Sequence, residues 1–477
     1  MAAPVASDNF GATLRPVQAQ RWNILGGFVV ALDSDRARRE IVGWCGLSLL
    51  ALALAGVFAL LLALSRVPGI SDIFPWPLQF FEKGLVIHVV FSFVVWFLGI
   101  LGALLVIATY RVSDGKPRLN VLGNLALIGA IVAFVLLFIP GFLDRGAPSL
   151  NNYVPVIIDP MYYAGLVVLA ISLSFAVIRL LINIPARTGP LEPVSIGALA
   201  GGLIYLFAIA CFIIAWIALG DGEINGDYNE QLFWGGGHIL QFSNVALLLV
   251  GWYVLGGLAL QTPLVPPRLL TLTHVYLIAA GCLGIVFYLV EKPFGAAQTE
   301  AFTLLQYAMP LPTVLIAGLG LSTIAKRVDA LPWRDPSFAC LALSILVFGV
   351  GGILGLFVDG ADTRTPAHYH AVIGGINLAF IGLFLGFFLP IIGRVAPTGG
   401  AVTALIHLYA WGQLLASIGL FLAGGYGAPR KTAGDAQGLE EIGAIAGLYM
   451  NGVGALIAVI GGVMFIWIAA RALKEKS

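Results

Sequence analysis

Long runs of apolar residues dominate the chain, and short polar segments separate one run from the next. Each run extends for roughly 20 residues, the length that an α-helix needs to cross the hydrocarbon core of a bilayer. The segments between them are rich in Gly, Pro, Asp and Asn, which favour turns. The pattern predicts an all-α polytopic membrane protein with twelve transmembrane helices. Their expected starts lie near residues 42, 84, 119, 158, 192, 229, 268, 301, 335, 366, 400 and 441.

Positions 1–41 contain no apolar run of membrane-spanning length and carry five arginines, and the twelve apolar runs occupy residues 42–473 as one domain. Lys and Arg outnumber Asp and Glu in the segments that would share a side with the N-terminus, whereas acidic residues prevail on the other side. The positive-inside rule therefore predicts that both termini are cytoplasmic, with residues 1–41 forming a cytoplasmic N-terminal segment. We expect a multi-pass protein of a bacterial-type inner membrane, surrounded by membrane lipid.

Composition narrows the possible classes of protein. Of the 477 residues, 60% are hydrophobic and 10% are charged, which excludes both an ordinary soluble domain and a disordered chain. The 25 Lys and Arg nearly balance the 24 Asp and Glu, so no nucleic-acid partner is expected. The four cysteines show neither CxxC nor CxxCH spacing, so any c-type haem would have to come from a partner.

The histidines fall into two groups by their expected depth in the membrane. His274 and His407 begin spans that enter from the cytoplasm, and we expect structural roles for them. The others follow the outer ends of the second, sixth and tenth spans and share the outer third of the membrane: His88, His238, His368 and His370. A separation of two residues turns a helix by about 200°, so His368 and His370 point to opposite faces. They cannot bind one metal, but they suit two cofactors, and axial ligation of haem iron fits this geometry.

Three segments then carry a family resemblance. They are Thr363-Arg-Thr-Pro-Ala-His-Tyr-His-Ala371 in the tenth span, Phe233-Trp-Gly-Gly-Gly-His238 in the sixth, and His88 followed by Ser92-Phe-Val-Val-Trp-Phe97 in the second. Together with the twelve spans, they resemble the catalytic subunit I of the haem-copper oxidase superfamily, which includes oxygen reductases and bacterial NO reductases.

The resemblance implies roles for matching residues. His88 and His370 would be the axial ligands of a low-spin haem, and His368 the proximal ligand of a high-spin haem that binds the substrate gas. His238 would match one ligand of a second metal, copper or non-haem iron, facing that haem. Arg430 and Lys431, in Gly427-Ala-Pro-Arg-Lys431, resemble the basic pair at the haem propionates. The implied activity is an oxidoreductase that passes electrons from a cytochrome c-like donor through two haems to O₂ or NO.

The chain also departs from the family. No histidine lies between His274 and His368, whereas the family places two histidines of the second-metal site at positions that correspond to about Phe287 and Tyr288. Phe242 stands where many oxygen reductases carry Tyr and NO reductases carry Glu. Because one imidazole holds copper poorly, the second metal has weaker support than the two haems. Glu291 beside His238 as iron ligands, and Tyr288 as a replacement phenol, are further alternatives.

Two other functions are compatible with these departures. One is a non-catalytic haem protein, a gas sensor or electron relay that has lost the second metal. The other is a transporter that retains the architecture without haem. Four acidic residues of one outer segment either suit docking of a basic electron donor or form ordinary solvated loops: Asp221, Glu223, Asp227 and Glu230.

Overall fold

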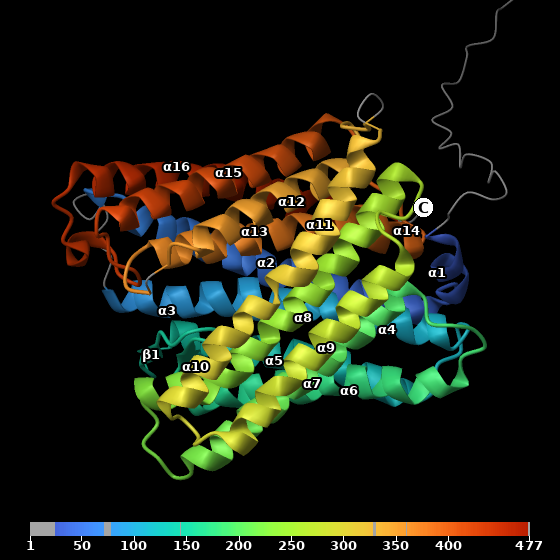
Figure 1. Cartoon of the computed structure of the whole chain (residues 1–477), viewed down its shortest axis with the longest axis horizontal. Helices are drawn as coiled ribbons and strands as arrows, with labels where there is room; N and C mark the ends of the chain where they lie inside the picture. The colour runs from blue at the N-terminus through green and yellow to red at the C-terminus, as the bar shows by residue number, and fades with distance from the viewer. Residues whose placement is uncertain (1–23, 71–77, 144, 328–330, 359, 476–477) are drawn as a thin grey trace, which may run out of the picture.

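A computed structural model describes residues 24–70, 78–143, 145–327, 331–358 and 360–475, without the side chains of 78–80. Twelve helical spans make up the bundle; many run roughly along the long axis of the molecule, whereas the sixth, seventh and eighth spans are tilted across it (Figure 1). The predicted fold class and span count are therefore confirmed. Helix α1 (Gly26–Ala31) lies at the same end of the bundle as the C-terminus, and we call this the terminal end. The opposite end carries β1 (Pro148–Ser149) and β2 (Val156–Ile157), and we call it the hairpin end.

Several spans are built from more than one helical segment. The second comprises α3 (Leu78–Val89), the π-helix η2 (Val90–Val95) and α4 (Trp96–Val112). The eighth comprises α10 (Ala296–Leu305), η5 (Gln306–Ala308) and α11 (Pro310–Ala325), and the tenth α13 (Arg364–Leu383), η7 (Phe384–Phe388) and α14 (Leu389–Ile391). The others are α2 (Asp35–Ser65), α5 (Asn120–Phe138) with η3 (Ile139–Phe142), α6 (Pro160–Asn183) with η4 (Ile184–Ala186), α7 (Pro193–Leu219), α8 (Gly226–Leu260), α9 (Pro267–Val290), α12 (Pro336–Gly355), α15 (Gly400–Gly425) and α16 (Ile442–Lys474), with η8 (Gly434–Gln437) in the last loop.

Polar side chains in the loops fix where several spans begin. Ser34, Asp159, Glu192, Asn225 and Asp335 each accept hydrogen bonds from backbone N–H groups of the first helical turn. This capping satisfies donors that a helix cannot satisfy internally. Proline also favours the start of a helix, because it has no N–H to satisfy, and it occurs in the first turn of α6, α7, α9, α11 and α12.

Two helix starts differ from the sequence-based expectation. The first span begins at Asp35 rather than near residue 42, because Ser34 caps a polar first turn; residues 1–23 of the predicted N-terminal segment lie outside the described part. The second span continues through Glu82 and Lys83 instead of starting after them. Lys83 is buried, and its ammonium group donates to the carbonyls of Leu143 and Arg145 at 2.8 and 3.0 Å. His88 therefore lies almost three turns from Leu78, deeper than the predicted single turn.

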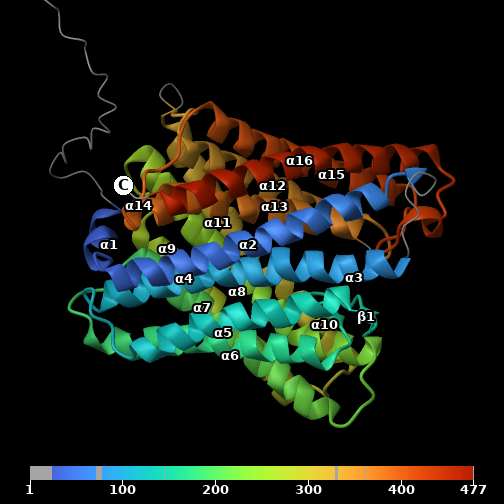
Figure 2. The same ribbon diagram turned by 180° about the vertical axis from the view of Figure 1, so that it is seen from behind.

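Three spans form the centre of the bundle. Within the described residues, 89%, 89% and 83% of the most apolar stretch is buried in the second, sixth and tenth spans, against 28–56% in the others. Figures 1 and 2 show α8 and α13 flanked on both sides by other helices. The central spans are those that carry His88, His238, His368 and His370.

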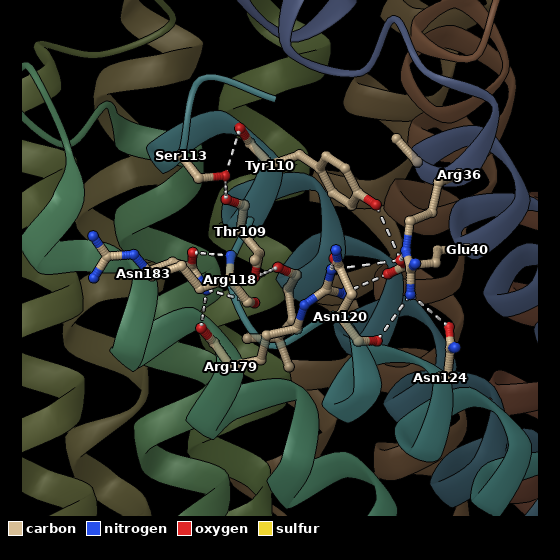
Figure 3. A network of polar contacts seen from close by, with 12 residues as sticks. Arg36, Glu40, Thr109, Tyr110, Ser113, Arg118, Asn120, Asn124, Arg179 and Asn183 are labelled. Atoms are coloured by element: carbon tan, nitrogen blue, oxygen red, sulfur yellow. Dashed lines mark hydrogen bonds and ion pairs between the residues drawn. The ribbon is translucent and has the colours of Figure 1, made fainter. Parts of the chain in front are cut away.

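A buried ion pair joins four helices at the terminal end (Figure 3). Arg179 of α6 donates to Glu40 of α2 at 2.5 Å, and both side chains are almost fully buried. Tyr110 of α4 and Arg36 of α2 donate to the same carboxylate at 3.0 and 3.1 Å. Arg179 also donates to Asn120 of α5 at 2.8 Å. Because each charge has several partners, this cluster offsets much of the cost of burying it.

Removing one partner should leave the other charge buried without compensation. We expect Arg179→Ala to lower the free energy of unfolding by about 3–5 kcal/mol. The control is Arg38→Ala, which breaks the solvent-exposed pair with Asp33 and should cost less than about 1 kcal/mol. Thermal unfolding in detergent measures both, and equal effects of the two substitutions would contradict a stabilising role for the buried pair.

Candidate functional site

His88 of α3 and His370 of α13 lie between the second and tenth spans. His370 is near enough to His88 for their charges to interact. Deeper in the bundle, the indole N–H of Trp96 donates to the Asn377 amide oxygen at 2.8 Å and joins the same two spans. Asn377 follows His370 by seven residues, so both lie on one face of α13. This polar contact holds the two histidine-bearing spans together beneath the rings.

A π-helical turn adjusts the second span to this arrangement. The π-helix η2 starts two residues after His88 and ends just before Trp96. A π-turn takes up about one more residue than an α-turn, so Trp96 lies two turns below His88 on nearly the same face. In an uninterrupted α-helix the two side chains would diverge by about 80°.

Backbone carbonyls orient the rings of His88 and His368. The Nδ1 atom of His88 lies 3.0 Å from the Ala55 carbonyl, and that of His368 lies 2.7 Å from the Gly351 carbonyl of α12. Because a carbonyl only accepts, each Nδ1 carries the hydrogen and each Nε2 keeps its lone pair. The described residues bring no hydrogen-bond partner to either Nε2. Metal-ligating histidines are typically held in this way.

The remaining two histidines outside the sixth span have different surroundings. His274 is fully buried, with its two ring nitrogens at 2.7 and 3.1 Å from the carbonyls of Leu270 and Ala246. His407 accepts a hydrogen bond from Trp411 at 3.2 Å on the outer face of α15. The carbonyls close both ring nitrogens of His274 to a ligand, and Trp411 occupies Nδ1 of His407.

His238 of α8 is engaged at both ring nitrogens. Its Nδ1 lies 2.7 Å from the Trp234 carbonyl, and its Nε2 lies 2.9 Å from the Tyr153 hydroxyl. Tyr153 belongs to the loop between β1 and β2 at the hairpin end. The rings of Trp234 and Phe302 lie 4.6 and 5.8 Å from the imidazole. Aromatic side chains therefore enclose His238, and the Tyr153 phenol is hydrogen-bonded to its imidazole.

The three glycines before His238 make room for this enclosure. A Cβ atom at Gly235 would collide with the Tyr288 hydroxyl and Phe302, and one at Gly237 with the Tyr153 side chain. At Gly236 the obstacle would be the ring of Phe212 in α7. The Gly-Gly-Gly-His segment thus has a steric cause, because four aromatic side chains approach α8 where it lacks side chains.

Phe287 and Tyr288, the positions expected for the missing ligands, lie beside this enclosure. Their rings pack against Phe302 at 5.3 and 5.6 Å. Phe242 is fully buried one turn after His238, and Glu291 follows the last residue of α9. Among the described residues, no group of three or more His, Cys, Asp and Glu side chains could hold a metal ion.

Three cations gather at the hairpin end near His370. Arg66 interacts electrostatically with His370, and both Arg66 and Arg430 interact electrostatically with Tyr369. The Ala428 carbonyl accepts from the Thr363 N–H at 3.0 Å, which ties the loop carrying Arg430 and Lys431 to the start of α13.

Sequence reasoning missed three residues of the site. Arg66 is the first cation after the first span, a signal that was available. Tyr153 sits in a loop and Gln306 in the break of the eighth span, where its amide donates to the Tyr153 hydroxyl at 3.4 Å. No local sequence pattern marks either residue, because Tyr153 contacts His238, and Gln306 contacts Tyr153, from distant parts of the chain.

The sequence profile of cytochrome c and quinol oxidase polypeptide I matches residues 41–464. The chain belongs to this family. An uncharacterised protein of Aquifex aeolicus is 28% identical over 71% of this chain and 82% of its own length. An uncharacterised protein of Rickettsia prowazekii is 24% identical over 90% of this chain and 95% of its own length.

Proteins of the cytochrome c and quinol oxidase polypeptide I family typically bind haem. The oriented Nε2 lone pairs of His88 and His368 fit axial ligation of haem iron, and His370 interacts electrostatically with His88. The surroundings of His238 do not fit a second metal, because both ring nitrogens are hydrogen-bonded and aromatic side chains surround the ring.

The contact between Gly237 and Tyr153 can be tested directly. We expect Gly237→Ala to displace Tyr153 from His238 and to destabilise the protein by about 1–3 kcal/mol through overpacking. Gly46→Ala is the matched control in another span, since a Cβ atom there meets nothing within 4 Å. Thermal unfolding and the fluorescence of Trp234, whose ring centroid lies 6.0 Å from that of Tyr153, report the change. Identical behaviour of the two variants would contradict the steric explanation.

Proposed function

We propose that this protein is a membrane haem oxidoreductase that takes electrons from a c-type cytochrome or similar donor and delivers them to O₂ or NO. His88 and His370 would hold a low-spin haem, and His368 a high-spin haem with an open position for the gas. When bound, the haems carry single electrons and bind the diatomic gas. The observation that carries the proposal is the orientation of the His88 and His368 rings by backbone carbonyls.

The chain's own groups would position these cofactors. The carbonyls of Ala55 and Gly351 fix the ring tautomer and direct Nε2 away from the helix that supplies the carbonyl. The Trp96–Asn377 hydrogen bond continues to Tyr409, whose hydroxyl accepts from Asn377 at 2.8 Å. Arg66, Arg430 and Lys431 supply positive charge at the hairpin end, which suits haem propionates.

An electron donor would approach from the hairpin end. Asp221 and Glu223 between α7 and α8, and Asp227 in the first turn of α8, are exposed, whereas Glu230 is partly buried and hydrogen-bonded to Asn152. Exposed carboxylates favour encounter with a basic protein. Glu230 acts within the fold, so the proposed docking surface consists of the other three residues.

A second candidate is a gas sensor or electron relay without turnover. It is favoured by Phe242, which offers neither a phenol nor a carboxylate, and by the full hydrogen bonding of His238. Both candidates require haem, and they differ in whether reduced protein consumes the gas continuously.

Optical spectra of the purified protein test the ligand assignment. We expect two haems per chain, one of which shifts when CO is added to the reduced protein. His88→Ala and His370→Ala should each abolish the low-spin spectrum, because a six-coordinate haem needs both ligands. His368→Ala should abolish the CO-dependent shift and gas-dependent oxidation of the donor.

The matched control is His407→Ala, since that histidine lies on the outer face of α15 and should leave both haems unchanged. Wild-type protein without haem would refute the proposed function. Full CO binding and wild-type turnover in His368→Ala would refute the assignment of the gas-binding haem. Wild-type protein that shows the spectra of both haems but consumes no gas would select the sensor or relay.

Lys431 gives the second prediction for this function. Burial and the neighbouring Arg430 lower the pKa of Lys431 to about 8, although Glu230 opposes the shift. The ammonium charge is present below this pH and is lost as the pH rises through it. A nearby positive charge favours the reduced haem, so we expect the reduction potential of the low-spin haem to fall as the pH rises through about 8.

Potentiometric titrations at a series of pH values measure this step. Lys431→Arg should remove the step and keep the higher potential, because a guanidinium stays charged. Lys431→Met should remove the step and keep the lower potential at every pH. A step that persists unchanged in both variants would assign it to another group.

A further inference from the structure

The loop that carries Tyr153 is anchored firmly enough to place one side chain inside the bundle. Asn152 donates through its backbone N–H and its side-chain amide to the two carboxylate oxygens of Glu230, at 2.8 and 2.7 Å. Lys431 donates to the Leu150 carbonyl from the last loop of the hairpin end. These contacts join the loop to α8 and to the segment before α16.

Tyr153 itself adopts an unusual backbone conformation. Its φ angle is 66°, in the left-handed region that a bulky residue rarely occupies. Such a conformation persists where the surroundings determine it, and it is often found at functional sites. The anchors on Asn152 and the space above Gly237 provide those surroundings, and they direct the phenol into the enclosure of His238.

Hydrogen-bond chemistry defines the direction of each bond to His238. The Trp234 carbonyl accepts, so Nδ1 of His238 carries the hydrogen. Nε2 therefore holds the lone pair, and the Tyr153 hydroxyl donates to it at 2.9 Å. The Gln306 amide donates to the oxygen of the same hydroxyl at 3.4 Å, which favours this orientation. The lone pair that a metal would require is already used.

Nothing in the surroundings of this imidazole assists metal binding. Phe302 and Trp234 pack around it. Phe287 and Tyr288 stand at about the positions where the family resemblance would place two further histidines. Within the described residues, His, Cys, Asp and Glu form no cluster of three. A single imidazole is a weak site for copper or iron.

We propose that the Tyr153–His238 pair takes the place of the second metal, so that the gas-binding haem faces a phenol and an imidazole instead of a metal ion. This inference rests on the proposed function, because it places the pair opposite the haem held by His368. The ligand remains a diatomic gas, bound to one iron. The polarity on this side of a haem governs how the bound gas is stabilised, and the hydrogen-bonded Tyr153–His238 pair supplies that polarity here.

Metal analysis of the haem-loaded protein, produced in medium supplemented with copper and iron, tests the proposal. We expect iron in a ratio of one to each haem and no stoichiometric copper. One copper, or one iron in excess of haem, that is lost in His238→Ala would overturn the proposal while leaving the haem assignment intact. Protein without haem would overturn the proposed function and this inference together.

Infrared spectra of the CO complex provide a second readout that does not depend on turnover. Tyr153→Phe removes the hydroxyl and keeps the ring, so we expect a shift of the C–O stretching band. Tyr163→Phe is the matched control, since it removes a phenol of α6 that donates to Asn229 of α8 at 2.7 Å, away from His238. An unshifted band in Tyr153→Phe, or an equal shift in the control, would show that Tyr153 does not face the bound gas.

Discussion

Most buried polar groups in this bundle find their hydrogen-bond partners within the protein, because the hydrocarbon around the spans offers none. This constraint distinguishes the histidines from one another. Both ring nitrogens of His274 lie against backbone carbonyls and leave no open position for a ligand, whereas His88 and His368 each place only Nδ1 against a carbonyl and keep Nε2 open. A retained lone pair inside a membrane protein is costly unless a ligand takes it. The orientation of the rings thus supports haem binding more directly than their positions along the chain.

The same constraint explains the terminal end of the bundle. Glu40 and Arg179 are buried at a point where α2, α4, α5 and α6 meet, and their charges are satisfied by one another and by Tyr110 and Asn120. The pair lies near the start of α2 and the end of α6, whereas Tyr153 lies in the loop between β1 and β2 at the hairpin end. Polar contacts therefore fix the packing of α2, α4, α5 and α6 at one end, while the hairpin end carries the loop of Tyr153.

The length of the apolar runs predicted all twelve spans, because about twenty apolar residues in succession are typical of a helix that crosses a membrane. Depth was predicted less well: the charges of Glu82 and Lys83 suggested a loop, but Lys83 reaches backbone carbonyls of a distant turn and remains helical. The opposite directions of His368 and His370 follow from helix geometry alone. Tyr153 was missed because its position depends on a hairpin that packs against α8, a contact between distant segments.

The Gly-Gly-Gly-His segment connects local sequence to this distant contact. Each glycine removes a side chain where an aromatic ring approaches, and the last one admits Tyr153. A helix weakened by three glycines is unfavourable in isolation, so the packing of the rings must compensate. The glycines lower the stability of the helix but allow the Tyr153 hydroxyl to reach the imidazole of His238. In the arrangement that we propose, the absence of histidine from the seventh span and the Tyr153 contact belong together, with aromatic packing around His238 in place of metal coordination.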